Sequence, residues 1–105
     1  MKIIHIINGL DNGGAELSLF NICKYDKKNQ HIVISFFGTG IYKKKLKKNK
    51  NKVYCLNIIN IYQFDYIFKI FKILINEKPD LIQTWMPLSH LVGSVIGRLA
   101  GFKKI

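Results

Sequence analysis

The sequence predicts an α/β domain on an open, doubly wound, Rossmann-like parallel sheet, with about four strands in the order 3-2-1-4 and the start of a fifth. One observation behind this is a repeated short apolar run rich in β-branched residues, which is typical of strands buried on both faces. A second is that each run precedes a segment long enough for a helical crossover. The third is the length of 105 residues with 49% apolar content, which suits one domain with a real core. The runs occupy residues 3–7, 31–37, 53–58 and 81–85.

Helices are expected between these strands. The first covers residues 15–25 with Leu17 and Phe20 on its buried face, and the second, which is very basic, covers 41–50. The third runs from about residue 62 to Lys78, because the proline that follows disfavours helical geometry. Its apolar stripe, which predicts the side facing the sheet, consists of Phe64, Ile67, Phe68, Phe71, Leu74 and Ile75.

The last expected helix contains glycines at every fourth position. Gly93, Gly97 and Gly101 predict a helix lying close against the sheet, and Gly101 also suits a C-terminal cap. Residues 102–105 look like the opening of a fifth strand. The helix residues expected to face the core are Leu88, Leu91, Val92, Val95, Ile96 and Leu99.

The chain is strongly basic, with a formal net charge of +11, which predicts an anionic partner. All of its 17 basic side chains except Arg98 are lysines. Bidentate recognition of bases favours arginine, so no nucleic-acid partner is expected. The lysine run in residues 43–52 predicts either a solvated helix face or a contact with anionic lipid headgroups. The membrane-surface candidates are Lys43, Lys44, Lys47 and Lys48.

Targeting and metal-binding signals are weak. The N-terminal apolar run is too short for a signal peptide, and no stretch reaches the ~18 apolar residues that a membrane span needs. We expect a cytoplasmic protein, free or peripheral at the inner face of the membrane. Cys23 and Cys55 predict two reduced thiols, and without a second Cys or His at ligand spacing no metal is expected. His5 is expected to be a structural histidine, and His31 has no partner visible in the sequence.

Two segments are expected to border a ligand crevice. In a sheet of this order the crevice opens beyond the carboxyl ends of the first and fourth strands, between residues 8–16 and 85–90. Gly13 and Gly14 let backbone N–H groups approach a ligand, and the helix start after them favours phosphate. The alternative is a tight turn without a ligand. The glycine spacing fits neither a nicotinamide site nor a P-loop.

The same two regions resemble glycosyltransferase family 4 enzymes of the two-domain GT-B fold. The first is Asn12-Gly13-Gly14-Ala15-Glu16 after the N-terminal strand. The second is Lys78-Pro79-Asp80-Leu81-Ile82-Gln83-Thr84-Trp85, followed by the helix that ends in Arg98-Leu99-Ala100-Gly101. The passage from Leu46 to Leu56 is also similar, so the resemblance covers nearly the whole chain.

The resemblance implies roles for matched positions only. In the family, the glycine-rich loop after the first strand packs against the diphosphate of a nucleotide-sugar donor, a role that falls here to Gly13 and Gly14, with Glu16 beside them. Trp85 and His90 would face a glycan or lipid-linked acceptor. Each has a structural alternative, since His90 could be a solvated helix-start residue and Trp85 could pack beneath the following helix. No catalytic residue is carried over, and no cofactor is implied beyond the nucleotide-sugar as co-substrate.

The resemblance implies that residues 1–105 correspond to the N-terminal part of the first domain of a GT-B enzyme, and we expect the donor-binding domain to be absent from this chain. The leading hypothesis is a fragment of a retaining glycosyltransferase of bacterial cell-envelope polysaccharide synthesis, expected to be inactive alone. The alternatives are a standalone binding module for a phosphorylated ligand and an inactive truncated gene product. A nucleic-acid binder ranks last, because only Tyr42 and Tyr54 lie near the lysines to stack on bases.

Overall fold

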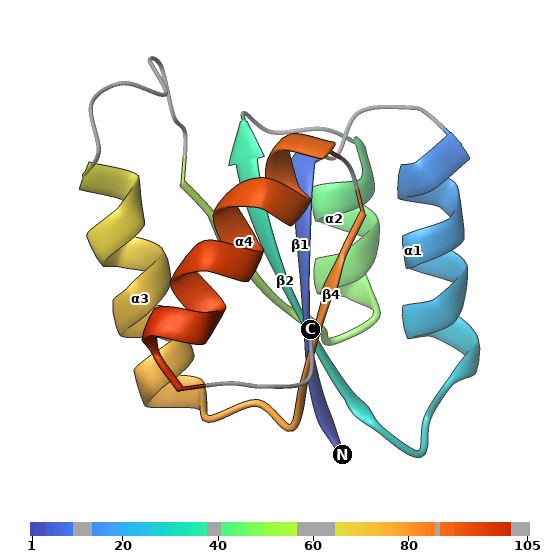
Figure 1. Ribbon diagram of the computed structural model, residues 1–105. Coiled ribbons are helices and arrows are strands. Elements are labelled where there is room, and N and C mark those ends of the chain that lie inside the picture. The colour runs from blue at the N-terminus through green and yellow to red at the C-terminus, as the bar shows by residue number, and fades with distance from the viewer. Residues whose placement is uncertain (10–13, 38–40, 57–64, 86, 102–105) are drawn as a thin grey trace.

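A parallel sheet with helices on both faces forms the body of the chain (Figure 1). The structure, a computed structural model, describes residues 1–9, 14–37, 41–56, 65–85 and 87–101. Strands and helices alternate along the chain, as the sequence predicts, and the expected fifth strand at 102–105 lies outside the described residues. The elements are β1 (Lys2–Gly9), α1 (Gly14–Tyr25), β2 (Gln30–Phe37), α2 (Ile41–Lys48), β3 (Lys52–Cys55), α3 (Asp65–Glu77), β4 (Leu81–Thr84) and α4 (Pro87–Leu99).

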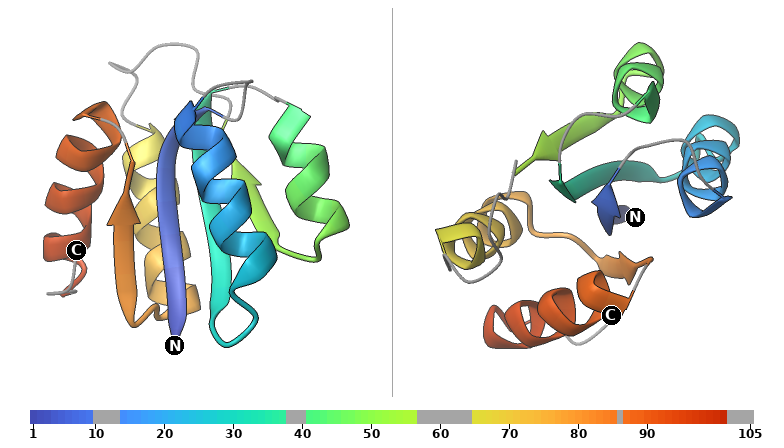
Figure 2. Two further views of the ribbon diagram at one scale, coloured as in Figure 1. Left: turned by 90° about the vertical axis from the view of Figure 1, so that its right-hand side faces the viewer. Right: turned by 90° about the horizontal axis from the view of Figure 1, so that it is seen from above.

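The sheet has the order β3-β2-β1-β4, and all neighbouring strands are parallel, which confirms the predicted fold class. β1 is central: its Ile4 pairs with Ile32 of β2 on one side and with Ile82 of β4 on the other. Figure 2 shows α1 and α2 on one face of the sheet and α3 and α4 on the other. The middle of β1 is buried because helices cover both of its faces.

Alternating side chains of the strands divide the core into two layers. The hydrophobic cluster toward α3 and α4 contains Ile4, Ile6, Ile32, Ile34, Phe36, Tyr66, Ile70, Leu74, Ile82 and Ile96. The layer toward α1 and α2 contains Ile7, Leu19, Cys23, Val33, Tyr42 and Leu46. Two buried histidines, His5 and His31, lie at odd-numbered positions of β1 and β2, as do the strand residues of this second layer. The buried polar residues that the structure describes, His5, His31 and Ser35, therefore all lie at odd-numbered strand positions on this side of the sheet.

Two helices bury only part of the side that was expected to face the sheet. In α1, Phe20 packs against the core as predicted but Leu17 is exposed, and the buried residues are Leu19 and Cys23, which lie one turn apart. In α3, Leu74 is buried and Ile67 packs against the core, as predicted. In α3, Phe68 is 76% exposed, although it belongs to the predicted stripe. That stripe also loses Phe71 and Ile75 to the surface, whereas the buried residues are Tyr66, Ile70 and Leu74. Apolar side chains surround most of α3, so two different stripes were possible.

The orientation of α4 is set by a glycine. A Cβ atom on Gly93 would lie 2.9 Å from Cδ1 of Ile6 and 3.1 Å from Cγ2 of Thr84, so the helix rests directly on β1 and β4. At about 100° per residue, position 95 lies about 160° and position 99 about 120° around the helix from position 93, so both point away from the sheet. Val95 and Leu99 are consequently exposed, contrary to expectation.

The helix ends as predicted. Gly101 has a φ of +93° and its N–H donates to the carbonyl of Arg98 (3.1 Å), which is a glycine C-cap.

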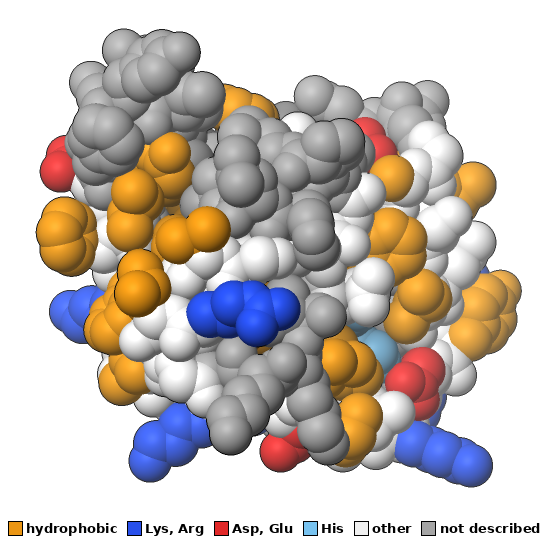
Figure 3. All heavy atoms as spheres, viewed as in Figure 1, with side chains coloured by type: hydrophobic (Ala, Val, Ile, Leu, Met, Phe, Trp, Pro, Cys, Tyr) orange, Lys and Arg blue, Asp and Glu red, His pale blue; other side chains and the backbone are white. Residues whose placement is uncertain are grey.

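Hydrophobic side chains gather over α3 and α4 on the face shown in Figure 3. Within the described part of the chain, no helix has the length and apolar character needed to cross a membrane.

Candidate functional site

The two segments expected to border a ligand meet at the carboxyl edge of the sheet. β1 ends at Gly9 and β4 ends at Thr84, and these strands are neighbours (Figure 1). The backbone N–H of Trp85 donates to the carbonyl of Ile6 (3.1 Å), which continues the β1–β4 ladder by one residue. α1 begins at Gly14 beside the same edge. The structure thus brings Gly14, Glu16 and Trp85 to one end of the sheet.

Gly14 opens α1. A Cβ atom built on it would have no heavy atom of the described residues within 4 Å. Among the described residues the positive-φ positions are Lys50, Lys78 and Gly101, so Gly14 does not need glycine for its backbone conformation. The first-turn N–H groups of a helix attract anions, and a carboxylate there, such as the half-buried Glu16, is also favoured. Gly13 lies outside the described residues.

Trp85 turns toward α1 and does not pack beneath α4. Its half-buried side chain lies against the layer that contains Leu19 and Cys23. Its indole Nε1–H donates to Nδ1 of His5 across 3.1 Å. The sequence offered packing beneath the following helix as the alternative, and Trp85 does pack against the sheet, but on the α1 face. His90 lies in α4, and its side chain is outside the described part of the chain.

His5 is the second member of a chain of hydrogen bonds. Its Nε2 lies 2.8 Å from Nδ1 of His31, and Nε2 of His31 lies 2.9 Å from Oδ2 of Asp26. The two imidazoles are stacked, with centroids 5.0 Å apart. His5 is a structural histidine with satisfied hydrogen bonds, as predicted, whereas the sequence missed both partners of His31.

The environment sets the charges along this chain. Burial, and then the neighbouring His31, lower the pKa of His5 from 6.5 to about 4. Hydrogen bonds from Asn29 and His31 are the largest causes that lower the pKa of Asp26 to about 2. At neutral pH the carboxylate is therefore ionised and His5 is neutral. The negative charge lies at the end that reaches solvent, where the Asp26 side chain is 31% exposed.

His5, Cys23 and His31 also have the donor atoms of a metal site, all within 4.8 Å of one another. Imidazole and thiolate suit zinc and copper. A metal on Nε2 of His5 would move the ring proton to Nδ1, where it would face the indole N–H of Trp85. Burial raises the pKa of the Cys23 thiol to about 11, which opposes the thiolate that a metal needs. These residues therefore do not fit a metal while Trp85 donates to His5.

The four membrane-surface candidates all lie on α2 and do not belong to the group of Gly14, Glu16 and Trp85. Lys44, Lys47 and Lys48 are exposed and Lys43 is half-buried. A hollow of about 430 Å³ between α1 and α2 is lined by Phe20, Lys24, Lys45, Lys48 and Asn49, none of which is acidic. The face around this hollow is thus cationic.

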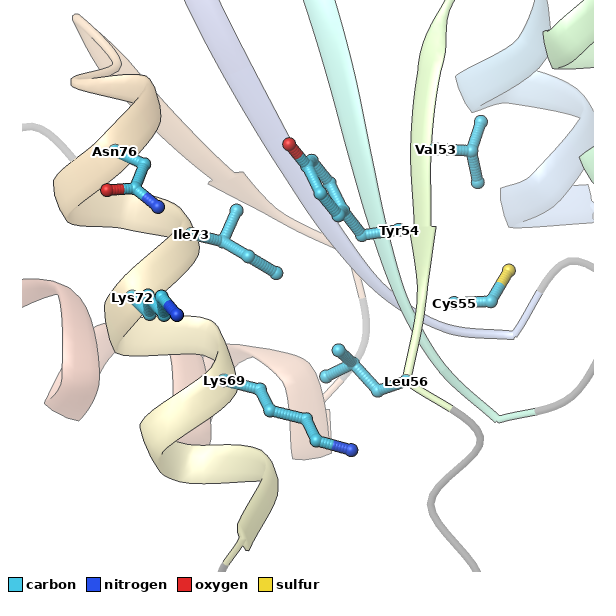
Figure 4. Close-up of a pocket in the computed structure, with 8 residues that line it drawn as sticks. All are labelled: Val53, Tyr54, Cys55, Leu56, Lys69, Lys72, Ile73 and Asn76. Atoms are coloured by element: carbon cyan, nitrogen blue, oxygen red, sulfur yellow. The ribbon is translucent and has the colours of Figure 1, made fainter.

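A groove of about 490 Å³ lies between β3 and α3. Tyr54 and Leu56 point toward α3, and Lys69 and Lys72 extend from the helix (Figure 4). The Tyr54 hydroxyl donates a hydrogen bond to Oε2 of Glu77 (3.2 Å). The sequence did not predict this groove, because it depends on which side of α3 faces the sheet.

Comparison with known proteins supports the fold. No protein-family model matches the sequence, and no curated protein is significantly similar to it. Among solved structures, Anabaena HepE in complex with UDP-glucose superposes with a TM-score of 0.80 and 24% identity over 99% of this chain. MurG of Acinetobacter baumannii superposes with a TM-score of 0.71 and 14% identity over 98% of this chain. Both are GT-B glycosyltransferases, and this chain spans only 28% and 33% of their respective lengths. The predicted resemblance is thus confirmed at the level of the fold.

Proposed function

We propose that this chain forms part of the acceptor-side domain of a glycosyltransferase that uses a nucleotide-sugar donor. The observation that carries the proposal is the space that the described residues leave around the Cβ position of Gly14, at the start of α1 and beside the carboxyl ends of β1 and β4. Ligands of open α/β sheets bind at this edge, where the strand order reverses. HepE, which has the same fold over this length, was solved with UDP-glucose bound.

Each matched residue has a physical task in this proposal. The missing side chain of Gly14 lets the diphosphate approach the first-turn N–H groups of α1, which supply positive partial charge. That charge takes the place of a metal cofactor, so none is required of this chain. The exposed part of the Trp85 indole offers an aromatic face to a sugar ring of a glycan or lipid-linked acceptor. The retaining stereochemistry and a role in bacterial cell-envelope polysaccharide synthesis belong to the same proposal.

Titration of UDP-glucose into the ¹⁵N-labelled 105-residue chain tests it. We expect weak binding, on the order of 1 mM because one wall of the site is present, with shifts concentrated at Gly9, Gly14, Ala15 and the Trp85 indole. Gly14→Ala should weaken binding at least fivefold while leaving Tm unchanged, since the added Cβ meets nothing in the protein. Ser18→Ala, at an exposed position of the same helix, is the matched control and should bind as the wild type does.

The alternative, a standalone module for a phosphorylated ligand, predicts a different result. Pyrophosphate would then bind as tightly as UDP-glucose and would leave the Trp85 indole signal unmoved. Absence of shifts near β1 and α1, or equal binding by Gly14→Ala, would contradict the glycosyltransferase proposal. Peripheral contact of the α2 lysines with an anionic membrane at the cytoplasmic face is a separate part of the proposal, and it has its own test below.

A further inference from the structure

The α1 side of the sheet contains a continuous polar chain beside the apolar cluster of Ile7, Leu19, Cys23, Val33, Tyr42 and Leu46. It runs through the side chains of Asp26, His31, His5 and Trp85, over distances of 2.9, 2.8 and 3.1 Å. His5 and His31 are each only 3% exposed, so water does not replace these contacts. Among the described side chains, no buried polar atom lacks a partner. The polar groups therefore satisfy one another, and each depends on the next.

The hydrogen bonds of this chain can run in one direction only. An indole nitrogen donates and never accepts, so Nδ1 of His5 carries no proton and its Nε2 must donate. Nδ1 of His31 then accepts from His5, and its Nε2–H donates to the carboxylate of Asp26. Every proton points from Trp85 toward Asp26. Asp26 fixes the tautomer of His31, which fixes the tautomer of His5, which provides the acceptor for Trp85.

We infer that His5, His31 and Asp26 are positioning residues that hold the Trp85 indole in one orientation at the carboxyl edge of the sheet. The inference rests on the proposed function in one respect: it makes this indole the sugar-facing surface of the acceptor side. Asp26 never touches Trp85, yet its carboxylate determines whether the indole finds an acceptor. The ring of His5 is held from both sides, by a stacked imidazole and by the indole, whose centroid is 6.0 Å away.

The indole N–H resonance reads this arrangement directly, because Trp85 is the single tryptophan of the chain. We expect one sharp indole signal with slow hydrogen exchange in the wild type. His5→Leu removes the acceptor and should speed exchange roughly five- to tenfold, the loss of about one hydrogen bond. His5→Gln keeps one acceptor and one donor in that place and should restore most of the protection.

The long-range variant separates a relay from a set of independent pairs. Asp26→Ala should speed indole exchange and broaden the signal, whereas Asp26→Asn, whose amide oxygen still accepts from His31, should do so less. Asp80→Ala is the matched control, because Asp80 is another acidic residue that accepts from a backbone N–H, at 2.7 Å from Lys2. Circular dichroism on each variant confirms that it is folded. An indole signal that is identical in Asp26→Ala and the wild type would overturn the relay.

A second readout separates the relay from the proposed function. Glucose, used as a pyranose probe in the presence of UDP, should move the indole signal of the wild type and move it at least threefold less at equal concentration in Asp26→Ala. If the indole is released in Asp26→Ala but glucose shifts both proteins equally, the positioning role is refuted. If UDP-glucose and glucose bind neither protein although the indole responds to Asp26, the relay stands as a structural device, and the sugar-facing role fails together with the proposed function.

Discussion

Acid should destabilise this protein in a pH window set by one residue. His5 is neutral in the folded chain, because burial and then His31 lower its pKa from 6.5 to about 4. Between these two values the unfolded chain binds a proton at this position that the folded chain does not bind. Stability therefore rises with pH across the window, and it is lost as the pH falls from 6.5 toward 4.

The size of the loss follows from the shift. Each unit of pKa difference corresponds to about 1.36 kcal/mol, so the step from 6.5 to about 4 costs roughly 3 kcal/mol in the free energy of unfolding. That loss is a large share of the free energy of unfolding of a typical small domain, which is about 10 kcal/mol. Asp26 adds a separate step at lower pH, since its pKa of about 2 lies below the ordinary 3.8. Its contribution is lost only as the pH falls below 3.8.

Urea unfolding between pH 7.5 and 4 measures the effect. The wild type should lose roughly 3 kcal/mol across the window, with most of the loss below pH 6. His5→Gln cannot titrate and should show a much flatter profile, so the difference between the two proteins isolates His5 from the carboxylates. Parallel profiles for the wild type and His5→Gln would refute the reasoning. They would mean that His5 titrates in the folded chain as it does in the unfolded one.

Two further predictions concern α4 and α2. Gly93→Ala should lower the free energy of unfolding by about 1–3 kcal/mol in urea melts, despite the higher helix propensity of alanine, because the new Cβ would lie 2.9 Å from Cδ1 of Ile6. Gly14→Ala is the control, because no described heavy atom lies within 4 Å of its Cβ position. A Gly93→Ala variant as stable as the wild type would contradict the close approach. Replacement of Lys43, Lys44, Lys47 and Lys48 by glutamine should abolish binding to anionic vesicles in sedimentation assays, at about 1 kcal/mol for each lysine. The same change at exposed Lys27, Lys28, Lys69 and Lys78, which lie outside the 43–52 run, removes equal charge, and equal loss in both variants would show that net charge alone drives the binding.

The strands and their order could be predicted because the signal lies in consecutive residues. β1 and β2 are mostly apolar and buried on both faces, which is typical of short strands covered on both sides of the sheet. The helix faces could not be predicted as well. α3 offers two apolar stripes, and the stripe that is buried contains Ile70 and Leu74 and leaves Phe68 outside. The choice depends on packing against α4 and the sheet, which composition does not express.

The histidine pair was within reach of the sequence, but only in combination with the topology. Parallel pairing of β1 with β2 places Ile3 opposite His31, so His5 is two residues further along and on the same face. The expected strand order predicts the pairing but not this register. The spacing of Cys and His along the chain did not show that His5, Cys23 and His31 lie together, because the three residues come from three different elements.

Trp85 connects the two parts of the candidate site. Its backbone N–H is bound to the carbonyl of Ile6 and its indole N–H to His5, so β1 holds both donors of the residue. Rotation of the indole would leave Nδ1 of His5 without its donor inside a layer that water does not reach, which carries a penalty comparable to a lost buried hydrogen bond. At Gly14, beside the same edge, no heavy atom of the described residues lies within 4 Å of the Cβ position. The proposed function uses both features, because the fixed indole would orient a sugar ring while the space at Gly14 would admit a diphosphate.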